Sequence, residues 1–226
     1  MTVYKLISTD DYPALVIDGI LMHCIKWTSP KKDAENKVKI LGIKKGRVLD
    51  ICTGLGYTAI AASRCADEVV TIEKDENVIE IAKNNEYSAE LFTSKSKNIK
   101  SIIGDAYDEI EKFDDECFDY LIHDPPTLSR AGELYGEKFY KNLYRVLKSG
   151  GKLFHYVSKP GSKYRNKSVE KGIINRLRNV GFEVKIYEKA SGVVCFKKGF
   201  KFGWEEGLSD TKKKLYSIEL QHKSLE

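Results

Sequence analysis

The sequence predicts an α/β protein built on a doubly wound, mostly parallel sheet, and three observations lead to this prediction. Arg47–Ala62 reads as a short strand, a turn containing Gly54 and Gly56, and the start of a helix. Short apolar strand candidates then alternate with amphipathic helix candidates along the chain. Several of these strand candidates end in a carboxylate, at the edge of a parallel sheet where ligands bind.

The segment before this domain is predicted to form a small β-hairpin. Residues 14–25 contain two apolar runs around Asp18-Gly19, which is a strong hairpin-turn signal. A helix is then expected to begin at Ser29-Pro30 and to end at Gly42. We therefore expect residues 1–28 to be an N-terminal β-hairpin extension of the main domain.

The main domain is predicted to span residues 29–198. Its expected strands cover residues 47–50, 68–73, 101–103, 118–123 and 152–157, followed by an antiparallel pair at 182–188 and 193–197. Its further helices are expected from Tyr57 to about Cys65, around 78–85, from about 133 to 147 with a stop at 149–151, and at 168–179. Residues 199–226 are expected to form a basic C-terminal tail or helix.

Composition excludes several classes of protein. The chain has 226 residues, 42% of them hydrophobic, which suffices for a sizeable core. No apolar run approaches the roughly 18 residues of a membrane span, and the first residues lack a signal-peptide pattern. The five cysteines are scattered, with no C-x-x-C spacing. This predicts a cytoplasmic protein without a metal site, disulfides or a membrane partner.

Charge is distributed unevenly along the chain. Residues 1–140 hold 18 Lys/Arg against 25 Asp/Glu, whereas residues 141–226 hold 20 against 8. The segment Lys159–Lys167 places four cations and Tyr164 after a predicted strand end. Such a loop would suit RNA through phosphate contacts and base stacking, and it would equally suit a solvated surface.

The predicted strand ends define a candidate site. Glu73 lies 17 residues beyond Gly56 and suits the hydroxyls of a ribose. Asp105 is either a ligand contact or the N-cap of a helix that begins at Ala106. His155 is a candidate general base or a structural strand histidine.

Five motifs, in order and spacing, resemble the class I S-adenosylmethionine-dependent methyltransferases. They are VLDICTGLGYTA, TIEKDENVIEIAKNN, IIGDA, FDYLIHDPP and LKSGGKLFHY, and they cover about residues 47–198. The resemblance implies a Rossmann-like, seven-stranded fold with an antiparallel edge strand, and S-adenosylmethionine as cofactor. The whole chain also resembles an uncharacterised archaeal group of predicted methyltransferases.

The same resemblance implies a set of cofactor contacts. The methionine part would be held by Asp50 and by the turn Cys52, Thr53, Gly54, Leu55 and Gly56. Glu73 would take the ribose hydroxyls, Lys74 would flank the adenine, and Asp105 with Ala106 would meet the adenine. Cys52 is a departure, because the family usually has a glycine there.

Asp124-Pro125-Pro126-Thr127 resembles the D/N-P-P-aromatic signature of enzymes that methylate amino or amide nitrogens. A carboxylate and a proline carbonyl would accept hydrogen bonds from an NH₂ group and orient its lone pair. Thr127 replaces the aromatic residue, and a D-P-P-T stretch resembles ribosomal RNA methyltransferases that act on guanine. We therefore expect a nitrogen of an RNA base as acceptor; a bare stop for the strand is the alternative.

Two other functions remain open from the sequence. The hairpin, together with ELYGEKFYKNLYRVLKSGGKLF, resembles the polyamine aminopropyltransferases, which use decarboxylated S-adenosylmethionine. Their glycine-rich first motif differs from DICTGLG, and a basic C-terminal half is a poor neighbour for a polyamine. The other alternative is a non-catalytic RNA-binding domain of the same fold. The sequence does not predict the oligomeric state.

Overall fold

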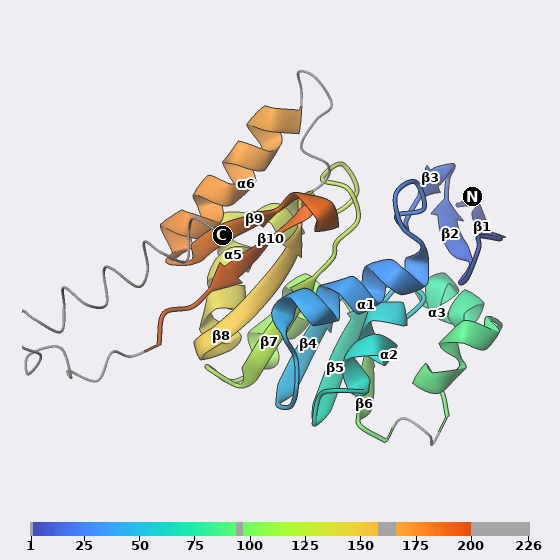
Figure 1. Cartoon of the computed structure of the whole chain (residues 1–226), viewed down its shortest axis with the longest axis horizontal. Coiled ribbons are helices and arrows are strands. Elements are labelled where there is room, and N and C mark those ends of the chain that lie inside the picture. The colour runs from blue at the N-terminus through green and yellow to red at the C-terminus, as the bar shows by residue number, and fades with distance from the viewer. Residues whose placement is uncertain (1, 94–96, 158–165, 200–226) are drawn as a thin grey trace, which may run out of the picture.

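The computed structural model describes residues 2–93, 97–157 and 166–199. Within this part of the chain a seven-stranded sheet is flanked by helices on both faces. A separate three-stranded sheet, β1 to β3, lies near helices α1 and α3 (Figure 1). The predicted basic segment Lys159–Lys167 falls largely outside the described residues, and so does the predicted tail from residue 200 onward.

The N-terminal sheet is antiparallel and contains β1 (Tyr4–Ile7), β2 (Ala14–Ile17) and β3 (Ile20–Leu21). The hairpin turn lies at Asp18 and Gly19, as predicted, and both residues have positive φ angles of 49° and 76°. Such a turn matches the twist of the flanking strands. β1 was not predicted, because it depends on pairing with β2 in the folded chain.

The seven-stranded sheet has the order β6-β5-β4-β7-β8-β10-β9. Its strands are β4 (Arg47–Ile51), β5 (Glu68–Glu73), β6 (Ile99–Ile103), β7 (Phe118–His123), β8 (Leu147–Tyr156), β9 (Glu183–Tyr187) and β10 (Gly192–Phe196). The neighbouring strands β6, β5, β4, β7 and β8 are parallel to one another, and β10 is antiparallel to both β8 and β9. This confirms the predicted fold class and places the antiparallel strand one position inside the edge.

Helices cover both faces of this sheet. The α-helices are α1 (Pro30–Leu41), α2 (Tyr57–Ser63), α3 (Glu76–Lys83), α4 (Ala106–Glu109), α5 (Glu137–Val146) and α6 (Asn166–Val180). The 3₁₀ helices are η1 (Glu86–Leu91), η2 (Ile110–Lys112), η3 (Gly132–Tyr135) and η4 (Glu188–Ala190). The α1 helix ends at Gly42 in the left-handed conformation, which is the expected glycine stop.

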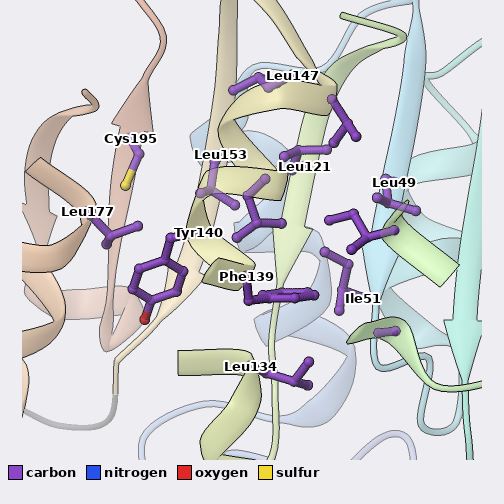
Figure 2. Close-up of a cluster of buried hydrophobic side chains, with 14 of the residues drawn as sticks. Leu49, Ile51, Leu121, Leu134, Phe139, Tyr140, Leu147, Leu153, Leu177 and Cys195 are labelled. Atoms are coloured by element: carbon purple, nitrogen blue, oxygen red, sulfur yellow. The ribbon is translucent and has the colours of Figure 1, made fainter. Parts of the chain in front are cut away.

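Two clusters of buried side chains lie on the two faces of the central sheet, and a third lies beneath the N-terminal sheet. On one face, α5 and α6 pack residues such as Phe139, Tyr140 and Leu177 against the sheet (Figure 2). On the other face, α1 and α2 pack Leu41 and Ala62 against the same strands. Because central parallel strands are buried on both faces, β4 and β5 read as nearly continuous apolar runs.

The segment after α5 differs from the prediction. The helix ends at Val146, and Leu147 already begins β8, so Gly150 and Gly151 lie within a strand and do not end the helix. A Cβ on Gly151 would lie 2.6 Å from the Leu147 side chain and 2.9 Å from the Asp119 backbone oxygen. Gly151 is therefore required by close packing at an irregular stretch of the β7–β8 pairing, whereas Gly150 has a φ of 82° and nothing within 4 Å of an added Cβ.

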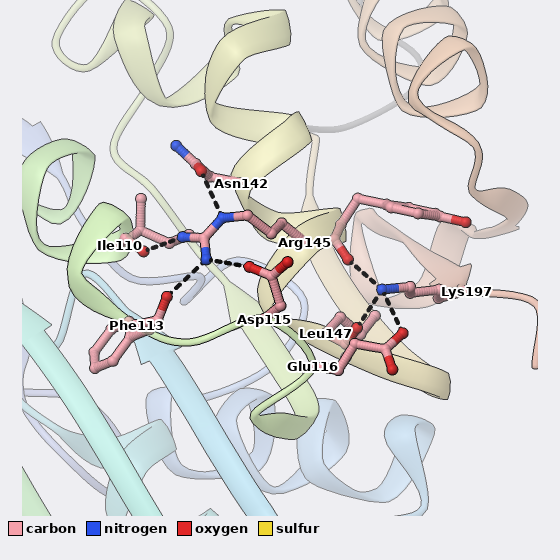
Figure 3. Close-up of polar contacts among 9 residues, drawn as sticks. Ile110, Phe113, Asp115, Glu116, Asn142, Arg145, Leu147 and Lys197 are labelled. Atoms are coloured by element: carbon pink, nitrogen blue, oxygen red, sulfur yellow. Dashed lines mark hydrogen bonds and ion pairs between the residues drawn. The ribbon is translucent and has the colours of Figure 1, made fainter.

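Polar contacts fix the amino ends of β7 and β8. The Arg145 guanidinium donates to the carbonyl oxygens of Ile110 and Phe113 at 2.9 and 2.7 Å and contacts Asp115 at 2.8 Å (Figure 3). The nearby Lys197 ammonium donates to the Leu147 carbonyl oxygen at 2.7 Å. These contacts lie at the end of the sheet opposite the carboxyl ends of β4, β5 and β7.

Within the described residues, no helix has the length and apolar character needed to cross a bilayer. The same residues contain no group of three or more His, Cys, Asp or Glu side chains that could hold a metal ion.

Candidate functional site

A cavity of about 540 Å³ lies at the carboxyl ends of β4, β5, β6 and β7. Its size is in the range of small-molecule sites. One part is lined by the turn after β4 and the ends of β5 and β6, and another part by the loop after β7. The remaining wall comes from α1 and from the N-terminal sheet with the segment that follows it.

The turn after β4 presents its backbone to the cavity. Cys52, Thr53 and Gly54 line the cavity, and Cys52 has φ of 70°. This left-handed conformation explains why a glycine suits that position, and cysteine adopts it at a cost of about 1–2 kcal/mol. A Cβ added to Gly54 would meet nothing within 4 Å, so the backbone there faces open space.

Leu55 and Gly56, which were also predicted to contact the cofactor, do not line the cavity. Leu55 is fully buried in the cluster beneath the N-terminal sheet. Gly56 has φ of 79°, and a Cβ there would lie 2.0 Å from the Leu91 side chain. The glycine at 56 is therefore required by turn conformation and by packing against η1, whereas Gly54 leaves room for a ligand.

Glu73 lines the cavity at the end of β5. Its Oε2 accepts a hydrogen bond from the Gly54 N–H at 2.8 Å, and its Oε1 accepts from the Lys74 and Asp75 N–H groups at 3.0 and 3.1 Å. Burial raises the pKa of this carboxyl, and the three backbone donors oppose that effect. The carboxylate is thus held rigidly, with lone pairs left to accept from hydroxyls.

Lys74, Asp105 and Ala106 also line the cavity. The Lys74 ammonium lies 3.5 Å from carboxylate oxygens of both Asp105 and Glu133. Asp105 Oδ1 accepts from the Tyr107 N–H at 2.9 Å, which makes it the N-cap of α4. Asp105 therefore fits both alternatives considered from the sequence, because it caps a helix and also faces the cavity.

Asp50 lies behind the cavity wall. Its side chain is buried, and its Oδ2 accepts from the Thr71 hydroxyl at 2.7 Å. That hydroxyl lies 2.6 Å from the hydroxyl of Thr53, which lines the cavity. Burial raises the pKa of Asp50 to about 7, and the Thr71 hydrogen bond opposes the rise. Asp50 supports the wall through two threonines and does not itself line it.

The loop after β7 brings Asp124, Pro125, Pro126 and Thr127 to the cavity. The Tyr135 hydroxyl donates to the Pro126 carbonyl oxygen at 2.9 Å and lies 3.5 Å from that of Pro125. This contact fixes the loop. It leaves the Asp124 carboxylate at the cavity wall, with its side chain 30% exposed.

Sequence reasoning missed two charged residues beside Asp124. The Lys37 ammonium lies 2.5 Å from Asp124 Oδ2 and 2.6 Å from Asp33 Oδ2, and both Lys37 and Asp33 line the cavity. Lys37 falls on the same helical stripe as Ala34 and Leu41, both of which are buried. A lysine on an apolar stripe was the available signal, because lysine is rarely buried without a partner.

The N-terminal sheet was predicted as an extension, but its role as a cavity wall was not foreseen. Leu15 and Ile17 of β2 line the cavity. The Tyr4 hydroxyl donates to Asp75 at 2.6 Å, and Arg130 contacts Asp18 at 2.9 Å. These contacts join the sheet to the loops after β5 and β7, which the sequence could not show.

His155 does not line the cavity. It is fully buried, its Nε2 lies 2.8 Å from the Tyr140 hydroxyl, and its ring centroid lies 4.4 Å from that of His123. Burial lowers the pKa of His155 well below its ordinary value. A neutral imidazole enclosed by aromatic rings belongs to the core, so we do not include His155 among the residues of the proposed mechanism.

The strand order, with a single antiparallel strand near one edge and polar residues at the carboxyl ends, defines the class I methyltransferase fold. The chain belongs to the family described as Conserved hypothetical protein 95, whose model matches residues 31–153. It is 56% identical over 196 residues to "Uncharacterized protein MJ1233" of Methanocaldococcus jannaschii, covering 86% of this chain and 67% of that protein. It is 31% identical over 186 residues to "Putative methyltransferase MJ0046" of the same organism, covering 71% and 68%.

Solved structures share this fold. A spermidine synthase in complex with the transition-state analogue AdoDATO superposes with a TM-score of 0.68 and 20% identity, covering 86% of this chain and 70% of that one. A protein from Methanococcus maripaludis, titled a putative S-adenosyl-L-methionine-dependent methyltransferase, superposes with a TM-score of 0.50 and 20% identity, covering 75% and 84%. At these identities the likeness establishes the fold alone.

Proposed function

We propose that the protein is an S-adenosylmethionine-dependent methyltransferase that acts on a nitrogen atom held at Asp124. One observation carries the proposal. A single cavity joins the Glu73 carboxylate and the open backbone at Gly54 to the Asp124 loop. The site thus has one region that suits a nucleoside. A second region next to it suits an acceptor that donates a hydrogen bond.

The residues present fit the cofactor. Glu73 is fixed by three backbone donors and would accept from the ribose hydroxyls. Gly54 provides a close backbone approach, and Asp105 and Ala106 would meet the adenine. The cofactor supplies a methyl group bound to a positively charged sulfur, which makes that methyl electrophilic.

Asp124 would orient the acceptor. Its carboxylate would accept a hydrogen bond from the acceptor N–H, and this bond would direct the nitrogen lone pair toward the methyl group. In the transfer the acceptor nitrogen would bond to the methyl carbon while the carbon–sulfur bond breaks, with S-adenosylhomocysteine as the leaving group, and the proton of the methylated nitrogen would pass to water. Positioning of this kind can account for several kcal/mol of the barrier. His155 takes no part, because it lies outside the cavity.

We propose a nitrogen of an RNA base as the acceptor. Thr127 cannot stack on a planar ring, but Trp27 and Tyr156 both line the cavity and offer aromatic surfaces for a base. The basic balance of residues 141–226 adds attraction to phosphates. A cytoplasmic location, as expected from the cysteine pattern, agrees with such a substrate.

The experiment that tests this proposal is incubation with methyl-labelled S-adenosylmethionine and separated RNA, protein and small-molecule extracts. Label that enters RNA, and that is lost in the Asp124→Asn variant, would support the proposal. Label that enters protein or small molecules alone would contradict RNA as the acceptor. RNA binding that does not weaken between about 50 and 200 mM salt would contradict it as well.

A polyamine aminopropyltransferase is the second candidate, and the two carboxylates Asp33 and Asp124 on the cavity wall favour it. Carboxylates of this kind would suit a polycationic acceptor. The Lys37 ammonium, however, already contacts both of them. Product formation from decarboxylated S-adenosylmethionine and a diamine would identify this activity, and its absence together with methyl transfer would exclude it.

A further inference from the structure

A buried lysine links helix α1 to the loop that would hold the acceptor. Asp33 and Lys37 lie one helical turn apart, and the Lys37 ammonium contacts Asp33 and Asp124 at 2.6 and 2.5 Å. The Lys37 side chain is 5% exposed, whereas those of Asp33 and Asp124 are 20% and 30% exposed. The lysine thus lies beneath two carboxylates that remain accessible from the cavity.

This arrangement is not explained by stability alone. Moving an ammonium out of water costs several kcal/mol, and replacing a buried ion pair with apolar residues is often neutral or stabilising. Burial would lower the pKa of Lys37, but Asp124 and Asp33 outweigh that effect and raise it, so the lysine is charged. One cation between two carboxylates leaves a net negative charge at the cavity wall.

Contact through one oxygen restricts Asp124. The ammonium contacts Oδ2, which limits the rotation of the carboxylate. We propose that Lys37, itself held by Asp33, is the positioning residue that presents Asp124 Oδ1 to the N–H of the acceptor. This inference rests on the proposed function, because it assigns Lys37 a role in that reaction.

Among the described residues, the other titratable groups near this pair include two neutral histidines and an arginine that is paired elsewhere. Burial lowers the pKa values of His23 and His123 to about 4, so both rings are neutral near pH 7. Arg130, which also lines the cavity, is paired with Asp18. The remaining groups facing the pair are Asp33, Asp50, Cys52, Tyr135 and Tyr156.

The test compares Lys37→Met and Lys37→Arg with Lys197→Met. Lys197 is a matched control, because it is also a buried lysine, with its ammonium on two carbonyl oxygens and 3.0 Å from Glu116, yet it lies away from the cavity (Figure 3). The first readout is the crystal structure of each variant, in which the orientation of the Asp124 carboxylate is compared. It needs neither cofactor nor acceptor.

In Lys37→Met we expect the Asp124 carboxylate to turn away from its orientation in the unmodified protein, because the contact on Oδ2 is lost. Turnover should fall at least about tenfold, since misplacement of a positioning group is costly, while S-adenosylhomocysteine affinity stays within about twofold of that of the unmodified protein. Lys37→Arg should restore most of the turnover, and Lys197→Met should change neither the carboxylate orientation nor the turnover.

An unchanged Asp124 orientation and unchanged turnover in Lys37→Met would overturn the inference, as would equal effects of Lys37→Met and Lys197→Met on turnover. Should Lys37→Met not fold, Asp33→Asn provides the test, because it removes the support of Lys37 and should displace the Asp124 carboxylate by a smaller amount. If the unmodified protein fails to bind S-adenosylhomocysteine, the proposed function fails, whereas the variant structures still decide whether Lys37 positions Asp124.

Discussion

Asp50 shows how a residue at the centre of the sheet can influence a ligand site without lining it. Its carboxyl is buried, and it is connected to Thr53 on the cavity wall through the hydroxyl of Thr71. Burial raises its pKa from 3.8 to about 7. A carboxyl with a raised folded-state pKa favours the folded protein at low pH and destabilises it once ionised.

We therefore predict that Asp50→Asn changes the pH dependence of the free energy of unfolding. Because the folded-state pKa of Asp50 is raised, its ionisation lowers the free energy of unfolding as the pH rises from about 4 to about 7. Above that range the loss reaches about 4 kcal/mol. The variant should gain stability relative to the unmodified protein over this window. Urea unfolding from pH 4 to 8 measures it, and parallel curves for the two proteins would contradict the assignment.

Asp124 is the residue on which the proposed chemistry depends. Asp124→Asn keeps the shape of the side chain but removes the charge, so its amide can no longer act as a purely accepting group toward an N–H. We expect kcat to fall at least about 100-fold, since orientation is worth several kcal/mol. Single-turnover methyl transfer measures this, and full activity in the variant would mean that the proline pair only ends β7.

The glycine turn after β4 combines two different requirements in one short element. Gly54 faces open space at the cavity, whereas a Cβ at Gly56 would lie 2.0 Å from Leu91. Both have positive φ angles, so alanine is strained at either position. The two positions should therefore respond differently to the same substitution.

We predict that Gly56→Ala destabilises the protein by more than Gly54→Ala, by roughly 1–3 kcal/mol, because it adds overpacking to the backbone strain. Gly54→Ala should instead weaken cofactor binding by narrowing the backbone approach. Thermal unfolding and calorimetry on both variants separate the effects. The reverse pattern, with Gly54 controlling stability and Gly56 controlling binding, would be incompatible with this assignment.

Sequence patterns predicted an element correctly where the local residue pattern and the surroundings in the folded chain favour the same structure. The strands 68–73 and 118–123 were predicted with their observed bounds, because short apolar runs in a parallel sheet end at fixed polar or proline residues. Glu73 and Asp124 were predicted as site residues because they lie at those ends, and both line the cavity. Lys37 and the stretch containing Gly150 were not, since burial against Asp124 and the irregular β7–β8 pairing arise only in the folded chain.

The whole molecule places its site where three parts meet. The central sheet supplies the wall proposed to hold the cofactor, α1 supplies Asp33 and Lys37, and the N-terminal sheet closes the cavity with Leu15 and Ile17. Leu15 also belongs to a buried cluster with Leu55 and residues of α1 to α3. The N-terminal sheet is therefore packed onto the same elements that form the site, and the sequence prediction of a simple extension understates its role.

We predict that Leu15→Ala loosens this wall. Leu15 is 1% exposed, so truncation should cost about 2–5 kcal/mol locally. Hydrogen exchange should accelerate in β1–β3 while the central strands stay protected. Leu177→Ala, in the separate core cluster of α5 and α6, is the control and should leave β1–β3 unchanged. Equal acceleration throughout the protein in both variants would contradict a separately packed wall.

The central claim is that the cavity binds S-adenosylmethionine through Glu73 and the turn after β4. Calorimetric titration with S-adenosylhomocysteine tests it most directly, using the unmodified protein and Glu73→Ala, with Lys197→Met as a control for a buried charge elsewhere. We expect one site per chain, at least about tenfold weaker binding in Glu73→Ala as a charge-assisted contact is lost, and unchanged binding in Lys197→Met. No binding to the unmodified protein, or equal affinity in Glu73→Ala, would contradict the claim.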